Sequence, residues 1–132
     1  MSMFEIVFSP TGGTEKVSGL VTGTLDGNIV TVDLTDSGLD FHGVSMAKGD
    51  VAVISVPSYA GRVPAVAVER LGMVRGNGAR AVLVCVYGGR AFEDTLIELE
   101  DVAKRAGFRV VAAVSAIAEH SVARQFAAGR PD

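Results

Sequence analysis

The sequence predicts an α/β domain in which five strands form an open, mostly parallel sheet with helices on both faces. Short apolar, β-branched segments alternate along the chain with stretches that have the helical spacing of apolar residues, and turn-forming residues separate the two kinds. The chain has 132 residues, 48% of them hydrophobic, which suffices for one core without disulfides. We therefore expect one domain that spans residues 1–132.

Five segments have the composition of strands. They are residues 3–8, 28–34, 50–56, 80–86 and 108–117. Four of them are almost continuously apolar, as expected of strands that are covered on both faces, and this pattern favours a parallel sheet.

Three segments between the strands are predicted as helices. They are residues 14–24, 64–74 and 92–106. The third has apolar residues at helical spacing from Leu96 to Ala103. Its opposite face carries acidic side chains, which predict a solvent-facing surface that could meet a basic redox partner. These residues are Glu93, Asp94, Glu98, Glu100 and Asp101.

Residues 35–49 separate the second and third strands. They contain three glycines and scattered polar residues without an apolar period. We therefore expect a loop with at most one helical turn where a second helix would otherwise lie.

Composition and charge exclude several classes of function. The 12 Lys and Arg against 15 Asp and Glu give a net charge of −3, which offers no general attraction to nucleic acid or anionic lipid. The apolar segments are shorter than the roughly 20 residues needed to cross a bilayer, so no membrane contact is expected.

Cys85 is the only cysteine, which excludes an internal disulfide and an iron–sulfur cluster and favours a cytoplasmic location. His42 and His120 lack the spacing of metal ligands, and we predict neither a metal site nor a catalytic side chain.

The first candidate loop, residues 9–14, leads from an apolar strand into a helix. Its sequence is Ser9-Pro10-Thr11-Gly12-Gly13-Thr14. The glycines allow the backbone to approach a ligand closely, the hydroxyl groups donate hydrogen bonds, and the N–H groups at the helix start point toward an anion. We predict a phosphate site that contains no lysine or arginine. The alternative is a glycine-containing turn in which Thr14 caps the helix.

Two further loops follow the third and fourth strands, and we call them the second loop (residues 57–64) and the third loop (residues 87–92). Their candidate ligand-binding residues are Pro57, Ser58, Tyr59, Ala60, Gly61 and Arg62 in the second loop, and Tyr87, Gly88, Gly89, Arg90 and Phe92 in the third. A planar heterocycle could stack on either tyrosine while glycine backbone groups reach its polar edge. The alternative is that both loops are tight turns whose tyrosines cover the core.

The three loops together resemble those of the flavodoxins. Residues 9–14 are similar to the flavodoxin FMN-phosphate loop, of the form hydroxyl-x-Thr-Gly-x-Thr. The order of strands and helices implies the 2-1-3-4-5 sheet of that family. With Glu119-His120-Ser121 and Gly129-Arg130-Pro131-Asp132 later in the chain, the second and third loops resemble the flavodoxin domain of bacterial flavodoxin–ferredoxin fusion proteins.

The resemblance implies FMN as the cofactor. Its phosphate would bind Ser9, Thr11, Gly12, Gly13 and Thr14, and its isoalloxazine ring would lie between the second and third loops. Arg62 and Arg90 would then place positive charge beside the ring and favour its reduction.

Two features depart from the fusion proteins. The single cysteine leaves no cysteine-rich cluster domain within these residues, and the fifth helix of the family is missing because residues 130–132 have only the pattern of a helix start. A missing helix would leave an apolar face of the sheet uncovered. We expect either residues 122–128 to fold back over that face or a second copy of the chain to cover it as a homodimer.

The leading functional hypothesis is an FMN-binding, flavodoxin-like electron-transfer domain in the cytoplasm, with a redox partner protein such as a ferredoxin-like one. One alternative is an FMN-dependent NAD(P)H or quinone reductase. The other is a flavodoxin-like interaction module without a cofactor.

Overall fold

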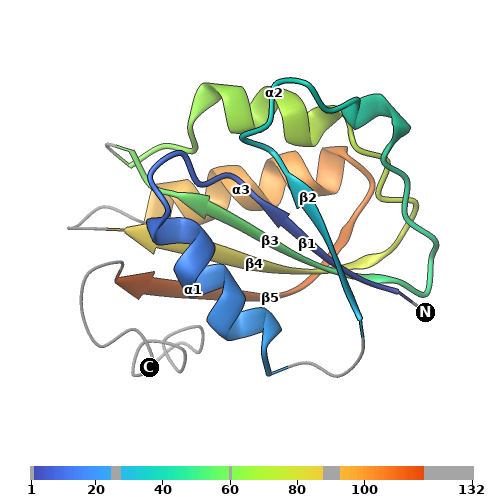
Figure 1. Cartoon of the computed structure of the whole chain (residues 1–132), viewed down its shortest axis with the longest axis horizontal. Coiled ribbons are helices and arrows are strands. Elements are labelled where there is room, and N and C mark those ends of the chain that lie inside the picture. Colours follow the sequence, from blue (N-terminus) through green and yellow to red (C-terminus); the bar gives the residue numbers. More distant parts are fainter. Residues whose placement is uncertain (1, 25–27, 60, 88–92, 118–132) are drawn as a thin grey trace.

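Five parallel strands form a single sheet in the order β2-β1-β3-β4-β5 (Figure 1). The computed structural model describes residues 2–24, 28–59, 61–87 and 93–117. The strands are β1 (Met3–Val7), β2 (Ile29–Asp33), β3 (Val51–Pro57), β4 (Arg80–Tyr87) and β5 (Arg109–Ile117). The predicted fold class and strand order are confirmed.

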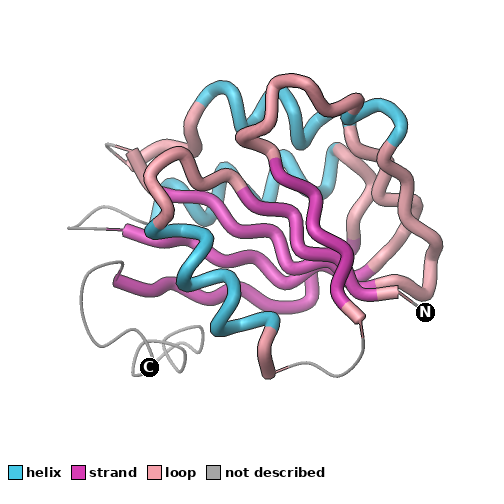
Figure 2. The backbone as a smooth tube through the Cα atoms, viewed as in Figure 1, coloured by secondary structure: helices cyan, strands magenta, loops and turns pink. Residues whose placement is uncertain are grey.

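Helices α1 (Gly13–Thr22), α2 (Ala65–Met73) and α3 (Glu93–Arg105) follow β1, β3 and β4. Helix α1 covers one face of the sheet, and α2 and α3 cover the other (Figure 1, Figure 2). All three predicted helices are confirmed. Between β2 and β3 the chain forms only one short 3-10 turn, η1 (Phe41–Gly43), as predicted for a loop with at most one helical turn.

The face toward α2 and α3 holds the larger part of the core. Ile6, Ile54 and Leu83 point to this side because successive side chains of a strand alternate between the two faces. Leu71 of α2 and Leu99 of α3 belong to the same buried cluster. The two helices are therefore held on the sheet by their apolar stripes.

The face toward α1 has a smaller apolar contact with one polar pair inside it. Val17 of α1 clusters with Val53 of β3 and Val84 of β4. Beside them, Ser55 Oγ donates a hydrogen bond to Ser18 Oγ over 2.7 Å, and both side chains are fully buried. Because a buried hydroxyl group needs a partner, this pair fixes the position of α1 on β3.

The connection between β2 and β3 contributes to the core although its sequence has no apolar period. Phe41 and Met46 are buried in the cluster on the α2 side. The Arg70 guanidinium of α2 lies 5.6 Å from the centroid of the Phe41 ring, and its Nη1 donates to the carbonyl oxygen of Leu34 over 2.6 Å. These contacts hold the segment after β2 against α2.

The edge strand β5 is less buried than its apolar composition predicts. Val111 is 50% exposed, and Ala112 is also exposed. Val110 and Ala112 pair with the consecutive residues Ala81 and Val82 of β4, so Val111 forms a β-bulge without a partner in that strand. The prediction that the continuously apolar strands are covered on both faces is therefore wrong for β5, because this strand lies at the border of the sheet, where the described helices leave part of its faces exposed.

Residues 118–132, including His120, lie outside the described residues. The expected cover of the sheet by residues 122–128, and its alternative of a second copy, therefore remain predictions. In the described part of the chain, no helix combines the length and the apolar character needed to cross a membrane.

Cys85 of β4 is fully buried, as predicted for a small core residue. Burial raises the pKa of its thiol to about 12. At pH 8 roughly one folded molecule in 10⁴ then carries the reactive thiolate, so we expect no labelling by a disulfide reagent until the chain unfolds. A urea titration followed by thiol labelling tests this expectation, and rapid labelling without urea would contradict it.

Candidate functional site

The carboxyl ends of β1, β3 and β4 lie side by side at the same end of the sheet, where these strands finish (Figure 1). The first loop leaves β1 toward α1 on one face, and the second loop leaves β3 toward α2 on the other face (Figure 2). Because β1 and β3 are neighbours in the sheet, the two loops diverge from adjacent strands. In an open parallel sheet, ligands bind in the crevice formed by such a divergence.

Hydrogen bonds at Ser9 hold the first loop in shape. The Ser9 N–H donates to Thr35 Oγ1 over 2.8 Å, and Ser9 Oγ accepts from the backbone N–H of Glu15 over 2.9 Å. Gly12 has a φ of +91°, a left-handed conformation that residues with a side chain rarely adopt. Its carbonyl accepts from the N–H of Lys16 over 3.1 Å, so the helix begins directly after the loop.

Four backbone N–H groups of the first loop donate to no other residue in the described part of the chain; we call them the open N–H groups. They belong to Thr11, Gly12, Gly13 and Thr14. They open α1, where the helix macrodipole adds partial positive charge. Ser9 Oγ accepts a hydrogen bond and donates none within the described part of the chain, so its proton is available to a ligand. This donor set suits an anion with several oxygen atoms.

Thr14 does not cap α1. It is the second residue of the helix and is buried, whereas Gly12 occupies the N-cap position and caps no N–H with a side chain. The capping role that the alternative interpretation gave to Thr14 is therefore wrong. Ser9 instead binds the N–H of Glu15 from outside the helix.

A tight turn forms the centre of the second loop. The Tyr59 N–H donates to the carbonyl oxygen of Arg62 over 2.9 Å, and the Arg62 N–H donates to that of Tyr59 over 3.0 Å. Gly61, the third residue of this turn, has a φ of +81°, a left-handed conformation that glycine adopts more readily than other residues. The turn leaves Tyr59 48% exposed at the molecular surface. Ala60 lies outside the described residues.

Helix α3 holds the second loop at two points one helical turn apart. Ser58 Oγ and Thr95 Oγ1 lie 2.6 Å apart, and the Thr95 side chain is fully buried. The Glu98 carboxylate accepts from Nε and Nη2 of Arg62 (3.0 Å each) and from the backbone N–H of Val63 (2.9 Å). The hydroxyl of Ser58, a predicted ligand-binding residue, is thus shared with α3.

Glu98 does not belong to a merely solvent-facing acidic surface, and that prediction is wrong for this residue. Its side chain is 22% exposed, whereas that of Arg62 is 72% exposed. The hydrogen bond from Arg62 holds the pKa of the Glu98 carboxyl below its usual range. The same contact raises the pKa of Arg62. The expected positive charge of Arg62 is therefore compensated by a neighbouring carboxylate.

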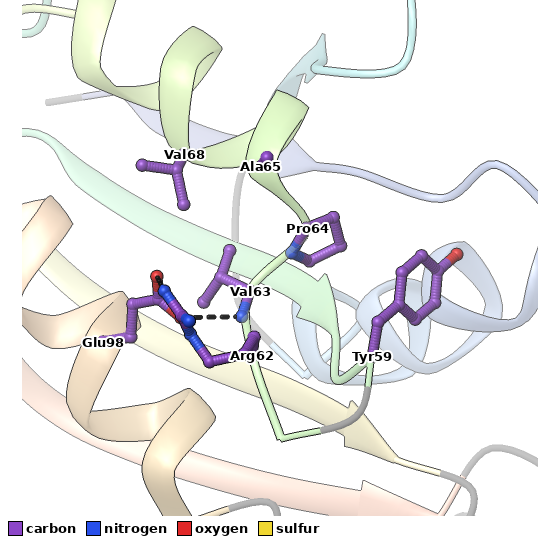
Figure 3. Close-up of a pocket in the computed structure, with 7 residues that line it drawn as sticks. All are labelled: Tyr59, Arg62, Val63, Pro64, Ala65, Val68 and Glu98. Carbon is purple, nitrogen blue, oxygen red and sulfur yellow. Dashed lines mark hydrogen bonds and ion pairs between the residues drawn. The ribbon is translucent and has the colours of Figure 1, made fainter.

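A cavity of 480 Å³ lies between the second loop, the start of α2 and α3 (Figure 3). It is lined by Tyr59, Arg62, Val63, Pro64, Ala65, Val68 and Glu98. Figure 3 shows the Arg62 side chain directed to Glu98 and the Tyr59 ring pointing away from that ion pair. No first-loop residue lines this cavity, so it is separate from the open N–H groups.

Tyr87 ends β4 and is partly buried. The structure brings Tyr87 to the carboxyl end of the strands, where the described residues of the first and second loops also lie. The other predicted residues of the third loop, Gly88, Gly89, Arg90 and Phe92, lie outside the described residues.

Sequence reasoning missed three residues that support the candidate site: Thr35, Thr95 and Glu98. Each lies on a different element from the loop that it holds. Within the described residues, no three His, Cys, Asp or Glu side chains are placed to hold a metal ion.

No protein-family model matches the sequence, and no curated protein matches it significantly. Several solved structures match nearly the whole chain. A flavodoxin of Streptococcus pneumonia TIGR4 is 20% identical over 96% of this chain and 99% of that one, with a TM-score of 0.65. Flavodoxin 1 from Bacillus cereus is 15% identical over 98% and 95% of the two chains, with a TM-score of 0.68. An NADH:FMN oxidoreductase in its apo form is 17% identical over 98% and 86%, with a TM-score of 0.70.

The fold is flavodoxin-like. Both flavodoxins and an oxidoreductase share the flavodoxin-like fold at comparable similarity, so the fold alone does not assign a reaction.

Replacing Glu98 by alanine removes the acceptor of the Val63 N–H. We expect amide hydrogen exchange at Val63 to become about fivefold to tenfold faster, as for the loss of one hydrogen bond. Lowering the pH through the lowered pKa of Glu98 should remove the charged contact with Arg62 and with it the stability that this contact adds while Glu98 is ionised; the protonated carboxyl keeps an oxygen that can accept from Val63.

The variant Glu98→Gln is the matched control, since its amide oxygen still accepts from Val63. It should keep most of the protection measured by NMR. An exchange rate at Val63 that is equal in Glu98→Ala and the parent chain would contradict the contact.

Proposed function

We propose that residues 1–132 form an FMN-binding domain that transfers electrons between partner proteins. The observation that carries this proposal is the set of open N–H groups at the start of α1. They lie at the carboxyl ends of β1 and β3, where the first and second loops diverge. An anionic ligand fits there because the backbone donors are already directed by the helix and need no side-chain movement.

The donor set suits a phosphate group better than a single carboxylate. Several N–H groups and the Ser9 proton are donors, and a phosphate offers more acceptor oxygens than a carboxylate does. The residues proposed to hold it are Ser9, Thr11, Gly12, Gly13 and Thr14. No lysine or arginine lies in the loop, so binding depends on hydrogen bonds and the helix dipole.

The isoalloxazine ring is proposed to lie between the second and third loops. Tyr59 offers an exposed ring, and the turn that ends in Arg62 leads directly into the contacts with α3. The similarity of the fold to the flavodoxins supports this arrangement. The bound flavin would supply the redox chemistry, while the chain holds its phosphate, orients its ring and sets the charge around it.

The alternative function is an FMN-dependent reductase, since an NADH:FMN oxidoreductase has a similar fold. Steady-state oxidation of NADH by the FMN-loaded protein separates the two functions. Turnover with a quinone or dye acceptor would favour the reductase. Electron exchange with a ferredoxin-like protein in the cytoplasm, without NADH turnover, would favour the carrier.

Riboflavin tests the phosphate site, because it lacks the phosphate and would leave the open N–H groups unpaired. Losing two or more hydrogen bonds predicts an affinity at least roughly 100-fold weaker than that of FMN. Fluorescence titration of the flavin measures both affinities. Equal affinities for the two flavins would rule out the phosphate assignment.

Two glycine variants give a matched comparison in the same titration. Gly12→Ala should weaken FMN binding because its φ of +91° disfavours a side chain. Gly19→Ala adds the same methyl group inside α1, where a Cβ meets no atom within 4 Å, and should leave FMN affinity unchanged. A similar effect of both changes would point to the helix as a whole rather than to the loop.

Charge variants test whether the second loop lies beside the ring. Reduction adds negative charge to a flavin, and the ion pair of Arg62 and Glu98 compensates itself. Glu98→Gln leaves the positive charge alone and should raise the midpoint potential of bound FMN, whereas Arg62→Gln should lower it. The shifts should be on the order of tens of millivolts, and the double variant should return toward the parent value.

The control is Asp101→Asn, which removes a carboxylate that pairs with Arg105 near the opposite end of α3. Asp101 lies about one helical turn farther along α3 than Glu98, and its side chain is 58% exposed, so solvent screening predicts a smaller shift in a redox titration. Potentials that stay equal in the variants of Arg62 and Glu98 would place the ring elsewhere.

A further inference from the structure

Thr35 lies just after β2, outside the three loops at the candidate site. Its Oγ1 accepts a hydrogen bond of 2.8 Å from the backbone N–H of Ser9, the residue with which the first loop begins. The bond joins residues that are 26 positions apart in the sequence. The segment after β2 thereby contacts the start of the anion-binding loop directly.

Three hydrogen bonds fix the backbone around Thr35. Asp33 Oδ1 accepts the Thr35 N–H over 2.9 Å. The N–H of the fully buried Leu34 donates to the carbonyl oxygen of Val7 over 2.7 Å, and its own carbonyl accepts from Arg70 Nη1 over 2.6 Å. The backbone that carries the Thr35 side chain is thus held by β1 on one side and by α2 on the other.

Ser9 transmits this constraint to the helix. Its N–H is bound to Thr35, and its Oγ accepts from the N–H of Glu15 in the first turn of α1. Both the peptide plane and the side-chain rotamer of Ser9 are therefore determined. Since the open N–H groups lie between Ser9 and Glu15, their directions depend on this pair of bonds.

We propose that Thr35 is a positioning residue for the anion-binding loop. It contacts no ligand itself and acts through Ser9. The proposal rests on the proposed function and adds to it a residue that follows β2, outside the three loops. This positioning role explains why a residue with a hydroxyl group, Thr35, follows β2 at the point where the chain turns toward η1.

A purely structural role for Thr35 would have different consequences. Loosening of the whole domain would weaken the binding of every flavin in parallel. Misplacement of the first loop alone would weaken the binding of the phosphate-bearing flavin and leave riboflavin unaffected. The ratio of the two affinities therefore separates positioning from stability.

The test uses Thr35→Val, which keeps the shape of the side chain and removes the acceptor, and Thr35→Ser, which keeps the acceptor. We expect the dissociation constant of FMN to rise about tenfold in Thr35→Val and to stay within about twofold of the parent in Thr35→Ser. Riboflavin affinity should not change. Thr24→Val removes an exposed hydroxyl bound to the carbonyl of Val21 beyond the other end of α1, and it should leave both affinities unchanged.

Amide hydrogen exchange in the ligand-free chain gives a second measurement. Thr35→Val should speed exchange at Ser9 and also at Glu15, because Ser9 would no longer be held in position. Unchanged exchange at Glu15, equal FMN affinity in Thr35→Val and the parent, or a parallel loss of riboflavin affinity would each overturn the role of Thr35. Failure of the parent chain to bind FMN would contradict the proposed function instead, and exchange at Glu15 would then decide on Thr35.

Discussion

The handedness of the chain connections is the constraint on which the candidate site depends. A connection between parallel strands is right-handed, so the face that it covers follows from the direction in which the chain moves along the sheet. From β1 the chain moves outward to β2, and from β3 it moves the opposite way to β4. Helices α1 and α2 must therefore lie on opposite faces. The first and second loops, which precede these helices, therefore separate. The first turn of α1 is left open to a ligand at the carboxyl end of the strands.

The two loops are supported from opposite sides of the molecule by different kinds of contact. The first is bound to the segment after β2, and its helix is fixed by the buried hydroxyl pair of Ser18 and Ser55. The second is bound to α3 by a neutral hydroxyl contact and by the carboxylate of Glu98. Of these two loops, only the second is bound directly by a carboxylate, and protonation of Glu98 would weaken that contact as the pH falls.

The strands, helices and their order could be predicted from the sequence because each has a local signal. Apolar runs mark the buried strands, and the spacing of Leu96, Leu99 and Val102 marks one face of α3. The supporting roles of Thr35 and Glu98 have no such signal. Glu98 lies among other acidic residues on α3, and only the arrival of the second loop distinguishes it from Glu100, which pairs with Lys104 in its own helix. The exposure of β5 also follows from its place in the sheet rather than from its composition.

The bulge at Val111 bears on how the molecule avoids edge-to-edge pairing of its sheet with other chains. β5 has nine residues, is the last strand of the sheet in the described part of the chain, and carries its only charge at Arg109. A regular strand of this kind offers an uninterrupted row of N–H and C=O groups to any other extended chain, which is the first step of aggregation. One extra residue breaks the regularity of that row and increases the local twist. The irregularity that costs the sheet one paired residue thus makes its edge a poor template for further strands.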